Sequence, residues 1–110
     1  MPELVKPFFK PPPPIRDKRH VVFVASLSSG CCECGRIPVQ AHHLLRVVEK
    51  CMGRRSGDNW VIPVCYDRHR FIHRTGKDEQ YRDLARALWE NTGDAETCEN
   101  LVRYFREAAV

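Results

Sequence analysis

The chain has 110 residues, of which 43% are hydrophobic, and it carries a formal net charge of +4. This length predicts one domain with a small core, and domains of this size often recruit a metal ion or a partner for stability. No apolar stretch approaches the ~18 residues that a membrane span requires, and residues 1–7 lack the order of a signal peptide. We therefore expect a cytoplasmic protein, in which six cysteines favour metal ligands or free thiols over disulfides.

The charges are distributed unevenly along the chain. Residues 35–77 carry nine lysines and arginines against three acidic residues, whereas residues 78–110 carry four against eight. A basic segment rich in arginine suits a polyanion such as nucleic acid. The alternative is an ordinary solvated surface, and the charge distribution alone does not decide between the two.

The N-terminal third predicts an arm, a strand and a turn. Residues 1–19 are expected to be an extended arm, because the prolines at 11–14 favour polyproline II geometry. This arm is either a disordered tail or a nucleic-acid-binding arm, and residues 20–110 form the single domain. The β-branched, apolar residues 20–27 predict a short strand. Residues 31–36 (Cys-Cys-Glu-Cys-Gly-Arg) predict a knuckle-like turn.

The middle of the chain predicts two strands and a helix. Residues 37–43 indicate a strand, residues 44–58 an irregular basic loop, and residues 59–64 a second strand in which Pro63 limits pairing. Residues 65–74 predict a helix that ends at Thr75-Gly76.

Two amphipathic helices are predicted within residues 78–109. In the first, apolar residues recur at i, i+3, i+4, i+7 and i+8, namely Tyr81, Leu84, Ala85, Leu88 and Trp89. Asp94 can cap the second, whose apolar face carries Ala95, Cys98, Leu101, Val102 and Phe105. We expect both helices to form core and to take no direct part in catalysis.

Four of the five histidines fall in two short segments. His69 and His73 lie four residues apart in the predicted helix, so their side chains share one face and could bind one metal ion. His42 and His43 are neighbours in a predicted strand, where only one of them can face that ion. The other is then available as a base. His20 lies outside this pattern and is expected to be a surface histidine.

In this order, the segments resemble the HNH endonucleases, also called ββα-metal or His-Me finger nucleases. The resemblance covers residues 31–75 and rests on Cys31-x-x-Cys34-Gly35, Ala41-His42-His43, Gly57-Asp58-Asn59-Trp60-Val61-Ile62-Pro63-Val64-Cys65 and Arg68-His69-Arg70-Phe71-Ile72-His73. It implies an α+β fold in which a small ββα-metal finger packs against the two C-terminal helices. It also implies a metal-dependent endonuclease that hydrolyses phosphodiester bonds in DNA.

The resemblance assigns a role to each matching residue. His43 would be the general base, His42, His69 and His73 would bind one divalent metal, and Asn59 would orient His43. Family members use Mg²⁺, Mn²⁺, Ni²⁺ or Zn²⁺, and three imidazoles favour a transition ion over Mg²⁺. Two alternatives stay open: His42 and His43 could exchange roles, and Asn59 could be a simple turn residue.

The resemblance also implies a structural zinc ion, with Cys31, Cys34 and Cys65 as its matching ligands. The fourth position holds Arg68, which cannot bind a metal. Cys32 or Cys51 could replace it, or the cysteines could hold no metal and pack as small buried side chains.

Arginines surround the predicted site, and their guanidinium groups suit phosphate oxygens without reading a base sequence. The candidates for nucleic-acid contact are Arg46, Arg54, Arg55, Arg68, Arg70 and Arg74. Trp60 is expected in the core.

We therefore expect an endonuclease that is monomeric or homodimeric. One finger has one active site and nicks one strand, so cleavage of both strands would require a dimer. Two alternatives are a non-catalytic zinc-finger-like DNA-binding module and a degenerate nuclease that binds a partner. The sequence leaves its setting open among phage or prophage, restriction and repair.

Overall fold

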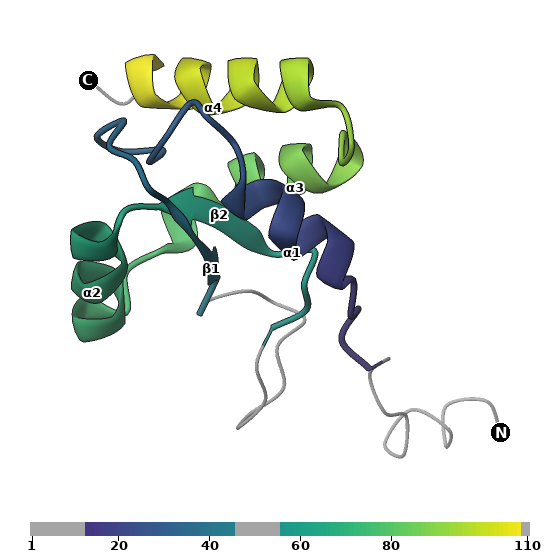
Figure 1. Cartoon of the computed structure of the whole chain (residues 1–110). Helices are drawn as coiled ribbons and strands as arrows, with labels where there is room; N and C mark the ends of the chain where they lie inside the picture. The colour runs from purple at the N-terminus through teal and green to yellow at the C-terminus, as the bar shows by residue number, and fades with distance from the viewer. Residues whose placement is uncertain (1–12, 46–55, 109–110) are drawn as a thin grey trace, which may run out of the picture.

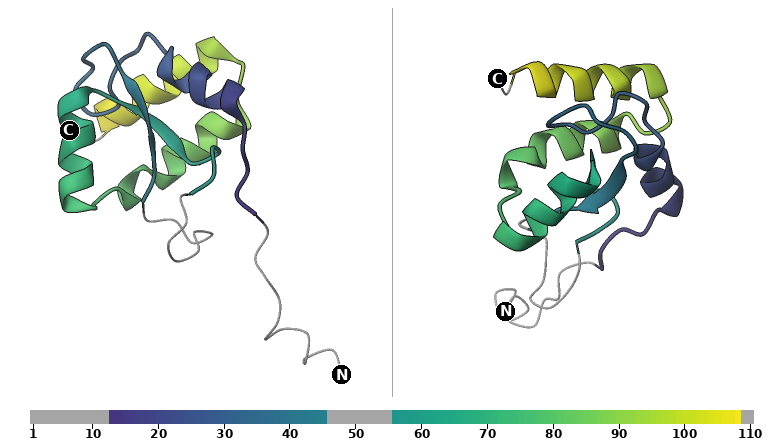
Figure 2. Two further views of the ribbon diagram at one scale, coloured as in Figure 1. Left: turned by 60° about the horizontal axis from the view of Figure 1, so that its bottom comes forward. Right: turned by 60° about the vertical axis from the view of Figure 1, so that its left-hand side comes forward.

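The computed structural model describes residues 13–45 and 56–108. Its elements follow in chain order as α1 (Lys18–Ala25), β1 (Gln40–His43), β2 (Val61–Val64), α2 (Tyr66–Thr75), the short 3-10 helix η2 (Glu79–Tyr81), α3 (Arg82–Glu90) and α4 (Ala95–Ala108). Figure 1 shows the two strands between α1 and α2, with α4 along the top, and α1 and α2 stay on opposite sides of the strands in both views of Figure 2. The fold is therefore a small α+β fold, as expected.

The two strands pair antiparallel and form the centre of the fold. Their register pairs Gln40 with Val64 and His43 with Val61. Both strands are shorter than the predicted segments 37–43 and 59–64. All four residues of β2 are buried, whereas in β1 His42 alone is buried and Gln40 is exposed, so β2 belongs to the core and β1 reaches the surface.

The first element differs from the prediction. Residues 20–27 were expected as a strand, but Lys18–Ala25 form α1, which also takes Lys18 and Arg19 from the predicted arm. The Asp17 carboxylate caps the helix by accepting a hydrogen bond from the backbone N–H of His20. His20 and Val24 are both buried at the i, i+4 spacing, and this burial outweighs the strand propensity of the β-branched residues.

The helix predicted at residues 65–74 is confirmed as α2. Cys65 caps its start, because its sulfur accepts from the backbone N–H of Arg68, and Gly76 ends it in the left-handed region at φ 70°. Ile72 is the one residue of α2 that is buried. The other side chains of this helix are left available at the surface.

The C-terminal helices form the predicted core layer, except that Ala95, predicted on the apolar face of the second helix, is exposed at the first turn of α4. Tyr81, Leu84, Ala85 and Leu88 are buried, and so are Cys98 and Val102 of α4. Asp94 caps α4 by accepting from the N–H and the hydroxyl of Thr97, as predicted. Trp60 is also buried, which confirms its core position. Within the described ranges, no helix is long and apolar enough to cross a membrane.

Candidate metal centres

The structure brings together the three histidines that were predicted as metal ligands. His42 lies on β1, while His69 and His73 lie one turn apart on α2. One ring nitrogen from each lies within 4.8 Å of the others, and the Nε2 atoms of His69 and His73 are 3.1 Å apart. Three converging imidazole nitrogens form a ligand set that suits a divalent transition ion.

Two polar side chains fix which nitrogen each of two rings presents. His42 Nε2 lies 3.0 Å from Asp78 Oδ2, and His69 Nδ1 lies 2.6 Å from Gln40 Oε1. Because a carboxylate and an amide oxygen accept hydrogen bonds, these ring nitrogens carry the hydrogen. The bare nitrogens are then His42 Nδ1, which is buried with no hydrogen-bond partner, and His69 Nε2. Partners of this kind orient the ligands of metal sites.

The environment keeps His69 neutral. Burial, followed by the nearby charges of His42, His73 and His43, lowers its pKa to about 4. A metal binds the neutral imidazole, so protons do not compete with a metal for His69 at neutral pH.

His43 points to the opposite side of β1, as the alternation of a strand requires. Its Nε2 donates to Asp58 Oδ1 over 2.8 Å, which leaves Nδ1 as the basic nitrogen. Burial acts to raise the pKa of Asp58, but its hydrogen bonds from His43 and from the Asp17 N–H outweigh burial and lower that pKa. His43 is therefore held by an ionised carboxylate.

Asn59 was expected to orient His43, but the partner in the structure is its neighbour Asp58. Asn59 lies in the turn before β2, where the N–H of Trp60 donates to the carbonyl of Gly57. Its Oδ1 lies 2.5 Å from the position that a Cβ on Gly57 would take. This placement matches the alternative of a turn residue.

Gln40, Asp58 and Asp78 are site residues that the sequence analysis missed. Gln40 precedes His42 by two residues and so shares its face of β1, which was a usable signal. Asp58 also had a signal, because it precedes Asn59 in the matched segment. Asp78 had none, since its contact with His42 joins positions 36 residues apart.

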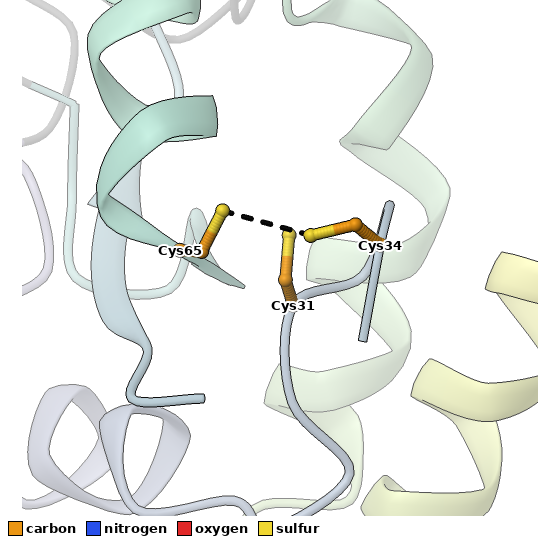
Figure 3. A group of neighbouring side chains, drawn as sticks. All are labelled: Cys31, Cys34 and Cys65. Carbon is orange, nitrogen blue, oxygen red and sulfur yellow. Dashed lines mark hydrogen bonds between the residues drawn. The ribbon is translucent and has the colours of Figure 1, made fainter. Parts of the chain in front are cut away.

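A second cluster contains the thiols of Cys31, Cys34 and Cys65, whose sulfur atoms all lie within 4.8 Å of one another. Figure 3 shows the three side chains converging. The sulfur atoms of Cys34 and Cys65 lie 3.6 Å apart. Cys34 is exposed and the other two are buried, so this cluster opens to the surface on one side. The prediction that these cysteines share a site is consistent with this geometry.

Two side chains of α4 hold the cysteine knuckle, residues 28–36, in place. The Glu99 carboxylate accepts from the backbone N–H groups of Ser28 and Ser29. The Arg106 guanidinium donates to the carbonyls of Ser29 and Cys31 at 2.9 and 2.8 Å. The thiols are thus positioned by the protein itself.

Cys32 and Cys98, the other cysteines among the described residues, do not join this cluster. Cys32 is fully buried in the core, where burial strongly raises the pKa of its thiol. Cys98 is also core, as predicted, and burial raises its pKa to about 11. Cys51 lies outside the described residues. By contrast, burial acts to raise the pKa of Cys31, but backbone N–H groups outweigh it and lower that pKa.

The prediction that His20 lies at the surface is wrong. The ring is 1% exposed, and its Nδ1 lies 2.7 Å from the hydroxyl of Thr92. Burial lowers the pKa of His20, and the charges of Asp17 and Asp58 oppose this effect only in part. His20 is buried because it lies on the same face of α1 as Val24, which is also buried.

The arginines of α2 lie on its exposed side together with two aromatic rings. The guanidinium carbon of Arg70 lies 5.6 Å from the ring centre of Tyr66, and those of Arg68 and Arg74 lie 5.0 and 5.6 Å from the ring of Phe71. The other candidates for nucleic-acid contact, Arg46, Arg54 and Arg55, lie outside the described residues.

Comparisons with protein families, with curated proteins and with solved structures find no match to this chain.

Proposed function

We propose that the protein is a metal-dependent HNH-type endonuclease that hydrolyses phosphodiester bonds in DNA. The observation that carries the proposal is the pairing of two features across β1. A group of three imidazoles converges on one side, and a fourth imidazole, His43, is held by a carboxylate on the other. A purely structural metal site needs only the first group, so His43 and Asp58 favour a catalytic role.

In this proposal His42, His69 and His73 hold one divalent ion, such as Ni²⁺, Mn²⁺, Zn²⁺ or Mg²⁺. The ion would supply Lewis-acid chemistry at the scissile phosphate. His43 Nδ1 takes a proton from the attacking water, while Asp58 accepts a hydrogen bond from the Nε2–H and stabilises the imidazolium that forms.

The exposed side of α2 is the proposed contact for the DNA backbone. Arg70 and Arg74 carry charges that suit phosphate oxygens, and each guanidinium lies near an exposed aromatic ring. Such contacts give affinity without base specificity. One centre nicks one strand, so cutting of both strands requires a homodimer or two successive events.

A plasmid-nicking assay tests the proposal. The full chain is incubated with supercoiled DNA and Mg²⁺, Mn²⁺, Ni²⁺ or Zn²⁺, beside His43→Ala and the control Arg103→Ala, which changes an exposed side chain of α4. We expect wild type and control to nick the plasmid and His43→Ala to lose most of the rate, since a general base contributes about 10²–10⁴-fold.

The proposal fails if wild type does not nick with any of the metals, or if His43→Ala nicks as fast as wild type. Tight metal and DNA binding without nicking would instead identify the non-catalytic DNA-binding module as the function. Circular dichroism of each variant checks that the fold is intact.

A further inference from the structure

The three-cysteine cluster could hold a metal ion, and the described part of the chain supplies it with no fourth ligand. Within residues 13–45 and 56–108, the group consists of Cys31, Cys34 and Cys65 and includes no further histidine, cysteine or carboxylate. Structural zinc sites are closed by four protein ligands, whereas sites with three protein ligands keep an open position for an external one. The cluster belongs to the second class.

The position of the missing ligand can be located from the spacing. Cys65 and Arg68 stand at the same interval as Cys31 and Cys34, and in both turns a backbone N–H donates to the first sulfur. The Glu33 N–H lies 3.4 Å from Cys31 Sγ, and the Arg68 N–H lies 3.5 Å from Cys65 Sγ. Position 68 therefore corresponds to a fourth ligand, but a guanidinium has donors only and cannot bind a metal.

The open side of the cluster faces a cavity. The cavity has a volume of about 470 Å³ and is lined by Cys34, Arg36, Cys65, Asp67, Arg68 and Phe71. The Arg68 guanidinium lies over the Phe71 ring. A divalent ion with three thiolates carries one net negative charge, and Arg68 supplies one positive charge at the same cavity. Arg36 and Asp67, which also line the cavity, pair over 3.0 Å and add no net charge. The charges are therefore balanced when water is the fourth ligand, and the cavity leaves room for it.

We propose that Cys31, Cys34 and Cys65 bind one thiophilic divalent ion of the Zn²⁺ class whose fourth position faces this cavity. Water occupies that position at rest and exchanges for an external thiol, which binds as the thiolate and releases its proton to solvent. The three cysteine thiols release their protons when the ion binds. This site is separate from the imidazole group, and it stands whether or not the protein cleaves DNA.

Cobalt substitution tests the site, because thiolates give Co²⁺ an intense sulfur-to-metal charge-transfer absorption. The probe is Co²⁺ added to the full chain carrying His69→Ala, which weakens the imidazole group. We expect the thiolate absorption in this protein, its loss on the further change Cys34→Ser, and its retention on Cys98→Ser, which alters a cysteine outside the cluster. Absence of the absorption would overturn the proposal.

The open position is tested by adding 2-mercaptoethanol to the Co²⁺-loaded protein. We expect the spectrum to change in the parent protein and to stay constant in Arg68→Cys, where a fourth thiolate closes the site. A parent spectrum that does not respond would show a closed site and refute the open position. If the parent spectrum does not respond, the variant Cys51→Ser shows whether Cys51 closes the site. A spectrum that responds to 2-mercaptoethanol only in this variant would mean that Cys51 is the fourth ligand.

Discussion

Asp78 controls how His42 presents itself to a metal, and its substitution gives the sharpest test of the imidazole group. The carboxylate is fully buried, and its Oδ2 accepts from His42 Nε2 at 3.0 Å and from the Leu45 N–H at 2.6 Å. The change Asp78→Asn keeps the shape and one oxygen acceptor but removes the charge. Loss of such a partner typically weakens metal affinity about 10–100-fold, equivalent to roughly 1.4–2.7 kcal/mol.

The affinity is measured by competition between the protein and a chromogenic chelator for Ni²⁺. A Cys34→Ser background keeps the thiol cluster from competing for the ion. The control is Asp83→Asn, which removes an exposed carboxylate from the first turn of α3. If Asp78→Asn binds Ni²⁺ as tightly as its parent while its circular dichroism is unchanged, the inference that Asp78 orients His42 is wrong.

Three further predictions concern stability and DNA binding. Burial lowers the pKa of His20 in the folded state, so the unfolded chain binds the proton more readily and the stability should fall as the pH drops below about 6.5. In thermal unfolding, His20→Gln should show a smaller fall than wild type, and identical pH profiles of the two proteins would contradict this role of His20. Arg106→Ala removes two charged hydrogen bonds to the knuckle and should lower the free energy of unfolding, measured in urea, by about 1.5–3 kcal/mol. Arg103→Ala is the control, and equal urea midpoints for Arg106→Ala and wild type would show that Arg106 does not stabilise the knuckle. The double change Arg70→Ala with Arg74→Ala should reduce the slope of log affinity against log salt by about 2 if each contacts one phosphate, and an unchanged slope would remove α2 from the DNA interface.

The sequence predicted most elements because their signals were local. The helix at Tyr66–Thr75 ends where Gly76 follows it, and Asp94 caps α4, as the residue types indicated. The failure at α1 arose because a run of β-branched residues fits a buried helix face and a strand equally well. The Asp17 cap was the signal that would have distinguished them.

In the candidate site, too, local patterns predicted some of the residues and left others unpredicted. His42, His69 and His73 converge because helix and strand periodicities place them, and periodicity is visible in a sequence. The contact between His42 and Asp78 depends on how the chain after α2 returns to β1, which no local pattern encodes. Asp58, and not Asn59, is the partner of His43. Its carboxylate, one position earlier in the same turn, accepts the hydrogen bond from His43 Nε2.

Cys65 connects the two candidate metal sites through the backbone of α2. It is one of the three clustered thiols, it caps α2, and its carbonyl accepts from the N–H of His69 one turn later. An ion held by Cys65 would fix the start of the helix that carries His69 and His73. If binding of either ion makes this helix more rigid, the two ions would share that cost, and the binding of each would increase the affinity for the other by the same factor. Occupancy of the thiols would then act as a reciprocal effector of the imidazole group.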